Sequence, residues 1–369
     1  MTQPQLEIQL LAVIVAAACA LPGVFLVLRR MALMSDAISH AVLLGIVVAF
    51  FLVGDLASPW LLLGAALTGV ATVSLVELLH RTRRVKEDAA IGLVFPALFS
   101  AGIILIARYA GHLHLDTDAV LLGELAFAPF DRLTLFGWDW GPRSTWLMGA
   151  VLALNAGFIA LFYKELKLAT FDAGLATALG FSPAFLHYAL MALVSGTVVG
   201  AFEAVGSALV VALVIAPPAT AYLLTDRLSR MLLLSAGVGA LSAVAGYWLA
   251  HLLDASIAGS MAAVTGVCFA AALLLAPGRG LLATARRRRR QRWEFAETML
   301  AIHLLNHEGL PEAERESRVA ELHEHLRWKP DFVARVVQRA ERRGLVARQG
   351  EHLALTGPGR DLARQALVR

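Results

Sequence analysis

Long apolar segments alternate with short polar connections along most of the chain. Each apolar segment runs for about 20 residues, the length that a helix needs to cross a bilayer. The segments lie near residues 7–28, 36–54, 58–79, 89–107, 144–163, 184–202, 205–224, 231–251 and 256–277. The sequence lacks the strict apolar–polar alternation of membrane β-strands. The pattern therefore predicts an all-α polytopic membrane protein with about nine transmembrane helices.

Composition and charge support this prediction and add a topology. The chain is 58% hydrophobic and 16% charged, which excludes an ordinary soluble domain. Lys and Arg gather on alternate connections, at residues 29–30, 81–86, 164–167 and 227–230. Because basic residues mark the cytoplasmic side, we expect nine spans with the N-terminus outside and the C-terminus inside. Either segment beside Glu203 is short enough to be re-entrant instead.

The start of the chain and its two cysteines argue against a signal peptide and against cysteine-based sites. The first 28 residues contain no Lys or Arg, so we expect a retained first span rather than a signal peptide. Cys19 and Cys268 both lie inside predicted spans. Their placement argues against a disulfide framework and against a cysteine-based zinc site.

A change of composition near residue 283 ends the membrane part. Residues 286–290 are five consecutive arginines, and the sequence from Trp293 onward has the pattern of a soluble helical domain. We therefore expect a transmembrane domain at 1–282, a polybasic linker at 283–292 and a small domain at 293–369. The arginines fix the cytoplasmic side and can contact anionic lipid. A nucleic-acid-binding arm is the alternative, although membrane anchoring already accounts for the run.

Asp36 and His40 open an apolar stretch that is otherwise free of charge. Four residues apart on a helix, a carboxylate and an imidazole face the same way and can share one cation. Ionisable groups in a membrane span are costly, so they point to a pathway or a pocket. The alternative is that Asp36 caps the helix at the surface and His40 hydrogen-bonds a neighbour. The pair is the first candidate metal site.

Other polar groups near the membrane have two interpretations each. Glu203 is a gate or an outer metal ligand, or else an interfacial carboxylate at a helix start. Four residues alternate along the connection before the fifth span and could attract cations, or could simply be solvated: His112, His114, Asp116 and Asp118. A phosphate-binding loop is missing, since none of the four lysines follows a glycine. The chain must therefore use a separate ATPase or an ion gradient for uphill transport.

Four ordered motifs resemble ABC-type manganese, zinc and iron uptake permeases. They are residues 28–45, around Asp36 and His40, and then residues 86–92, 118–125 and 203–221. The resemblance covers roughly residues 8–280. It implies a permease subunit in a bacterial cytoplasmic membrane, paired with a second copy or a related permease. It also implies a separate ABC ATPase and an extracytoplasmic metal-binding protein as partners, and metal coordination at Asp36 and His40.

The resemblance implies a transported divalent cation rather than a permanently bound cofactor. A carboxylate oxygen with an imidazole nitrogen suits manganese, zinc or ferrous iron. The surroundings of Glu203 resemble the manganese-type branch, so manganese is the favoured cargo, with zinc and iron open. No enzymatic activity is expected in this chain, because ATP hydrolysis would belong to the partner.

The connection between residues 163 and 183 resembles the coupling loop of ABC permeases. It is cytoplasmic by the charge rule and is predicted to be helical as far as Gly180. Phe171, Leu175 and Leu179 recur at four-residue spacing and form an apolar stripe beside Asp172. Such a stripe suits a helix that docks in a groove of the ATPase. The alternative is a surface helix packed on its own membrane domain.

The C-terminal domain shows the element order of a winged helix-turn-helix. Helical patterns cover 295–306, 312–326 and 331–343, a hairpin is expected around Gly350, and a last helix follows Thr356. Residues 344–360 resemble the DNA-binding domains of iron-dependent repressors. The domain carries 12 Lys/Arg against 12 Asp/Glu, so nucleic acid is not the expected partner. A docking or regulatory role against the ATPase or a partner tail is favoured.

Three histidines of this domain, His303, His307 and His323, suggest either a cytoplasmic metal sensor or a solvated helix face. Two other functions also remain open. One is a membrane-tethered, metal-responsive DNA-binding regulator, and the other is a gradient-driven secondary transporter.

Overall fold

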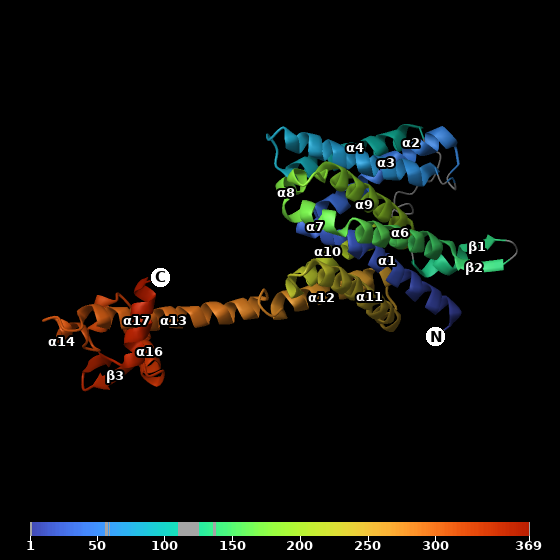
Figure 1. Ribbon diagram of the computed structural model, residues 1–369. Helices are drawn as coiled ribbons and strands as arrows, with labels where there is room; N and C mark the ends of the chain where they lie inside the picture. The colour runs from blue at the N-terminus through green and yellow to red at the C-terminus, as the bar shows by residue number, and fades with distance from the viewer. Residues whose placement is uncertain (1, 56–57, 59, 110–124, 136–137, 369) are drawn as a thin grey trace. The chain divides into compact units, whose positions relative to one another are not determined.

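The computed structural model describes residues 2–55, 58, 60–109, 125–135 and 138–368. The chain divides into two compact units, residues 1–279 and 280–369 (Figure 1). Each unit has a hydrophobic core of its own. His112, His114, Asp116 and Asp118, which the sequence offers as cation-attracting groups, lie outside the described residues.

Within the described residues, nine helices of the first unit are long and apolar enough to cross a membrane. They are α1 (Gln3–Leu28), α2 (Leu33–Val53), α3 (Trp60–Arg81), α4 (Glu87–Tyr109), α6 (Arg143–Leu161), α9 (Pro183–Val205), α10 (Ser207–Leu224), α11 (Leu228–Leu253) and α12 (Ile257–Leu275). The prediction of a polytopic membrane protein is confirmed, and the unit is mostly helical. The helices on either side of Gly206 have 23 and 18 residues, so both have the length of a span.

Helix α1 forms the centre of the first unit. It packs against α6, α9, α10 and α11, and Figure 1 shows it in blue among them. Small residues in its middle make this possible, because Ala16, Ala18 and Cys19 are fully buried and let neighbouring backbones approach. A Cβ atom at Gly23 would collide with the backbone of Val214 in α10, so α1 and α10 touch through their main chains.

Helices α2, α3 and α4 pack on one another and meet the rest of the unit mainly through α9. The contact between α2 and α3 is close, because a Cβ atom at Gly45 would collide with the Gly64 carbonyl and the Thr68 hydroxyl. This contact fixes the orientation of α2. On a helix, His40 points about 140° away from Gly45 and Asp36 points about 180° away. The two polar residues therefore face away from α3.

Short elements connect the spans at both ends. At one end are a 3-10 helix, η1 (Leu125–Phe130), and an antiparallel hairpin of β1 (Arg132–Leu135) and β2 (Trp138–Pro142). The Arg132 guanidinium fastens this hairpin to α1 through Glu7, at 3.1 Å, and also contacts Asp139 at 2.5 Å. Between α6 and α9 lie two short helices, α7 (Tyr163–Phe171) and α8 (Ala173–Ala178).

The second unit contains a long helix, three shorter helical segments before a hairpin, and a final helix. The elements are α13 (Leu281–His307), α14 (Ala313–Glu316), α15 (Leu322–His325), α16 (Pro330–Arg342), β3 (Val346–Gln349), β4 (His352–Leu355) and α17 (Gly357–Val368). Strands β3 and β4 pair antiparallel around Gly350, whose φ of +65° suits glycine. Residues 283–292, expected as a linker, are helical and lie inside α13.

The prediction of one continuous helix over residues 312–326 is wrong. The structure has two short helical turns there, α14 and α15, separated by residues 317–321. The reason is competition for backbone hydrogen bonds. The Leu353 amide donates to the Ser317 carbonyl, and the Val319 amide donates to the Glu351 carbonyl, both at 3.0 Å. The segment thus bridges to β4 and its neighbouring turn, and the helix period cannot continue through it.

Candidate metal site and coupling segment

Asp36 and His40 lie on one face of α2, as their spacing predicts. The Asp36 Oδ1 and His40 Nε2 atoms are 3.6 Å apart. The side chains are 42% and 36% exposed, respectively, so neither is sealed inside the unit. An oxygen and a nitrogen at this distance can both reach one cation after a small side-chain adjustment, since bonds to such metals are about 2.0–2.2 Å long. The structure therefore brings together the two residues of the candidate site.

The pair belongs to a stripe of α2 that the chain leaves partly open. Asp36, His40 and Leu44 are partly exposed and Val48 is exposed, each four residues from the last, whereas most other positions between them are buried. On one side of this stripe, the His40 ring stacks on Phe95 of α4 and meets the edge of Phe99, with ring centres 5.7 and 5.8 Å apart. The aromatic contacts hold the imidazole in place beside an uncovered face.

The hydroxyls next to the pair have other partners. The Ser35 hydroxyl donates to the Ala32 carbonyl, and the Ser39 hydroxyl donates to the Ser35 carbonyl, at 3.0 and 2.9 Å. Both serines are buried on the inner side of α2. These bonds keep the two hydroxyls on their own helix, so Asp36 and His40 supply the candidate cation ligands on this stretch of α2.

Glu203 lies apart from this pair. The Arg29 guanidinium, just before α2, reaches His187 near the start of α9, with Nη1 and Nδ1 3.4 Å apart. The starts of α2 and α9 are therefore at the same end of the bundle. Glu203 is sixteen residues further along α9, which is about 24 Å of helix. Of the described residues, none forms a hydrogen bond or ion pair with Glu203, which is exposed.

The candidate coupling segment is two short helices, α7 and α8, rather than one. The sequence predicts a helix up to Gly180, but the backbone turns at Asp172, which has φ −150° and ψ 89°. The Asp172 carboxylate then accepts a hydrogen bond from the Leu175 amide at 2.8 Å and caps α8. Gly180 ends α8 with φ +85°, a conformation that favours glycine. The local sequence thus encodes a bent segment with a defined beginning and end.

The apolar stripe of this segment faces away from its own unit. Leu166 and Ala176 are fully buried and anchor α7 and α8. In contrast, Phe171, Leu175 and Leu179 are 63%, 47% and 61% exposed. Large apolar side chains exposed together on a polar connection favour a contact with another protein over packing on the bundle.

Arg29 links this segment to the bundle. Its Nε donates to the Thr170 hydroxyl of α7 at 3.2 Å, while its Nη1 lies beside His187 of α9. The side chain is partly buried, so these contacts replace much of its hydration. A displacement of α7 therefore acts directly on the ends of α1 and α9, next to the start of α2.

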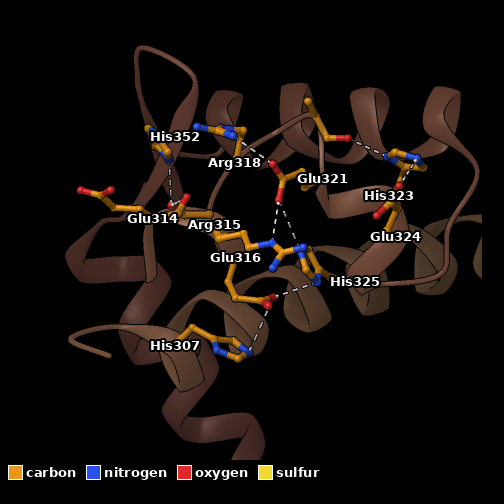
Figure 2. A network of polar contacts seen from close by, with 12 residues as sticks. His307, Glu314, Arg315, Glu316, Arg318, Glu321, His323, Glu324, His325 and His352 are labelled. Carbon is orange, nitrogen blue, oxygen red and sulfur yellow. Dashed lines mark hydrogen bonds and ion pairs between the residues drawn. The ribbon is translucent and has the colours of Figure 1, made fainter. Parts of the chain in front are cut away.

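In the second unit the structure gathers a different set of histidines from the predicted one. His303 and His307 of α13 lie together, with ring centres 4.9 Å apart. His323 turns away, and its Nδ1 contacts the Ala320 carbonyl at 2.7 Å. Figure 2 shows Glu316 and His325 near His307 instead. Sequence reasoning missed Glu316 and His325, because they reach α13 only through the irregular segment that was expected to be a helix.

The comparison with protein families decides the classification of the chain. Residues 5–276 match the family described as the ABC 3 transport family. The chain belongs to the ABC 3 transport family. It is a membrane permease subunit, and ATP hydrolysis in such transport systems belongs to a partner ATPase.

Relatives of this ABC 3 permease are described as membrane proteins of metal transport systems. It is 49% identical over 362 residues to the zinc transport system membrane protein TroD of Treponema pallidum, covering 98% of each chain. It is 51% identical to the manganese transport system membrane protein MntD of Bacillus subtilis, over 73% of this chain and 91% of MntD. The similarity to TroD thus extends through the second unit.

A solved structure supports the fold of the ABC 3 permease. A chain of PsaBC from Streptococcus pneumoniae, determined in complex with a Fab, matches with a TM-score of 0.63 at 30% sequence identity. The match covers 76% of this chain and 94% of the other. The shared part corresponds in size to the membrane unit.

Proposed function

We propose that this permease moves divalent first-row transition-metal cations into the cell, with Asp36 and His40 as the ligands that receive the ion. The observation that carries the proposal is the 3.6 Å approach of a carboxylate oxygen and an imidazole nitrogen on a partly open face of a membrane helix. Ionisable groups placed in a span mark ion pathways. The named cargoes of TroD and MntD, zinc and manganese, belong to the same chemical class.

Manganese is the favoured cargo. Two residues supply only two ligand atoms, and the open stripe of α2 leaves room for more. A second copy of the chain, facing the first across this stripe, would add another Asp36 and another His40. Two carboxylates, two imidazoles and water fit the larger, oxygen-rich shell of Mn²⁺, whereas Zn²⁺ is satisfied by four ligands. Zinc and iron remain alternative cargoes of the same site.

Energy comes from a separate ABC ATPase that binds the segment from α7 to α8. Phe171, Leu175 and Leu179 are the apolar anchors, and Asp172 and Gly180 set the shape that presents them. Arg29 passes the movement of α7 to the ends of α1 and α9. A metal-binding protein on the outer side delivers the ion, and Glu203, at the other end of α9 from His187, acts there as an outer ligand or gate rather than as a ligand beside Asp36.

The second unit is a cytoplasmic winged helix-turn-helix domain with a docking or regulatory role. Its order of helices followed by the β3–β4 hairpin supports this assignment. A DNA-binding function is disfavoured by the ion pairs of α16. Arg339 and Arg343, at and just beyond the end of that helix, both contact the buried Glu297 carboxylate of α13. The Glu297 carboxylate therefore offsets part of their positive charge, which weakens their attraction for phosphates.

Transport by the assembled complex tests this proposal. We expect Asp36→Asn and His40→Gln, alone and together, to reduce manganese uptake into vesicles that contain the permease, its ATPase and its binding protein. ATPase binding should be unchanged, since neither residue contacts α7 or α8. His251→Gln, at the exposed end of α11, is the matched control. Normal uptake by a correctly assembled double variant would show that the ion takes another route.

A further inference from the structure

His303, His307 and Glu316 of the second unit gather together, and His325 contacts the same Glu316 carboxylate. Suitable ligand atoms of the first three lie within 4.8 Å of one another. The Glu316 Oε2 atom is 3.4 Å from His303 Nε2, 4.0 Å from His307 Nε2 and 3.1 Å from His325 Nδ1. The Glu316 carboxylate of α14 is thus close to two imidazoles of α13 and one of α15, and Figure 2 shows it between His307 and His325.

The hydrogen bonds of this cluster leave some ring nitrogens without a partner. The His303 Nε2 atom is 3.1 Å from the Glu316 carbonyl. Within the part of the chain that the structure describes, however, His307 Nδ1 and His325 Nε2 are buried without a hydrogen-bond partner. Imidazoles and a carboxylate are the usual ligands of a transition metal.

The surroundings resemble those of a metal site as well. Glu321 faces the far nitrogen of His325, with Oε2 and Nε2 4.0 Å apart. Its own carboxylate is held by Arg318 at 3.0 Å and by Arg315 at 3.4 Å. At 4.0 Å Glu321 makes no hydrogen bond to the ring, but a carboxylate brought into hydrogen-bond distance behind a ligating histidine orients the ring and raises its basicity. Since Glu321 is already neutralised by two arginines, Glu316 supplies the negative charge at the centre.

We propose that His303, His307, Glu316 and His325 form a binding site for a divalent transition-metal ion, with Zn²⁺ preferred. Three nitrogens and one oxygen match the tetrahedral shell of zinc. In such a shell the ligand atoms are about 3.4 Å apart, given bonds of about 2.0–2.1 Å. The present spacing closes to that value by rotation of side chains that are not tightly enclosed. The ion displaces the hydrogen bond of His303 and fastens the α14–α15 segment to α13.

This site is separate from the proposed transport site and does not depend on it. No ligand is shared, because Asp36 and His40 belong to the other unit. The two proposals can therefore fail independently. A full-length protein that carries Asp36→Asn and His40→Gln removes the transport ligands and leaves the histidine cluster as the candidate site to be titrated.

Metal titration of that full-length protein tests the site. We expect one equivalent of Zn²⁺ to bind tightly, and Co²⁺ to give the intense visible bands of tetrahedral coordination. Adding His307→Gln with Glu316→Gln should weaken binding by more than about 100-fold, since both changes remove ligands themselves rather than supporting groups. His323→Gln, on the same short segment but turned away, should leave both signals unchanged.

A ligand exchange keeps the test decisive if the double variant is unstable. His307→Cys retains a ligand, so zinc should still bind, and Co²⁺ should gain a thiolate charge-transfer band in the near ultraviolet. Overturning results are an octahedral Co²⁺ spectrum in the parent protein or equal zinc binding with and without the His307 and Glu316 changes. Either would show a hydrogen-bonded histidine cluster with no metal.

Discussion

At the scale of single residues, buried charges are informative because each one needs a partner. Glu297 of α13 is fully buried, and its carboxylate accepts hydrogen bonds from Arg339, at 2.6 Å, and from Arg343. Both guanidinium groups remain about half exposed. The carboxylate and the two guanidinium groups therefore differ in hydration, because only the carboxylate is fully removed from water. The difference has a measurable consequence for stability.

Removing the arginines should cost more than removing the carboxylate. Arg339→Ala with Arg343→Ala leaves a buried, unpaired charge, which costs about 3–5 kcal/mol. Glu297→Leu leaves two guanidinium groups that can turn to water, and we expect a loss of about 1 kcal/mol. Hydrogen exchange of α16 amides in the full-length protein measures both values. Arg342→Ala, an exposed neighbour without this contact, is the control, and equal losses for the two variants would contradict the account.

At the scale of elements, the membrane helices could be predicted and the irregular connections could not. A span needs about 20 apolar residues, and that requirement is visible in the sequence. The spacing of Asp36 and His40 is likewise a local property of one helix. The break at Asp172 depends on a single cap, and the break at residues 317–321 depends on hydrogen bonds to a distant hairpin. Glu316 and His325 were missed for the second reason.

At this scale, we predict that the bent segment from α7 to α8 is needed to bind the partner ATPase. Replacing Phe171, Leu175 and Leu179 together by alanine removes exposed apolar area and only part of the local packing, because these side chains are 63%, 47% and 61% exposed. We expect the variant to fold normally, to lose its partner ATPase on purification and to lose transport. Phe127→Ala with Phe130→Ala removes similarly exposed rings from η1, and this control should keep the ATPase. Retention of the ATPase by the triple variant would show that it docks elsewhere.

At the scale of the whole molecule, the open stripe of α2 predicts how two copies meet. Leu44 lies one turn beyond His40 on that stripe. In a background with Cys19→Ala and Cys268→Ala, we expect Leu44→Cys to form a disulfide between two permease copies in the assembled complex. Leu241→Cys, exposed on α11, should not. The reverse result would place a different helix at the interface and leave the metal site with ligands from one chain only.

The position of the transported ion in the assembled complex is the most direct test of the central claim. An anomalous difference map of manganese-loaded crystals locates the ion without reference to activity. We expect a peak between two α2 helices, within bonding distance of the Asp36 carboxylate and the His40 imidazole. A membrane-embedded peak remote from both side chains, with none beside them, would contradict it.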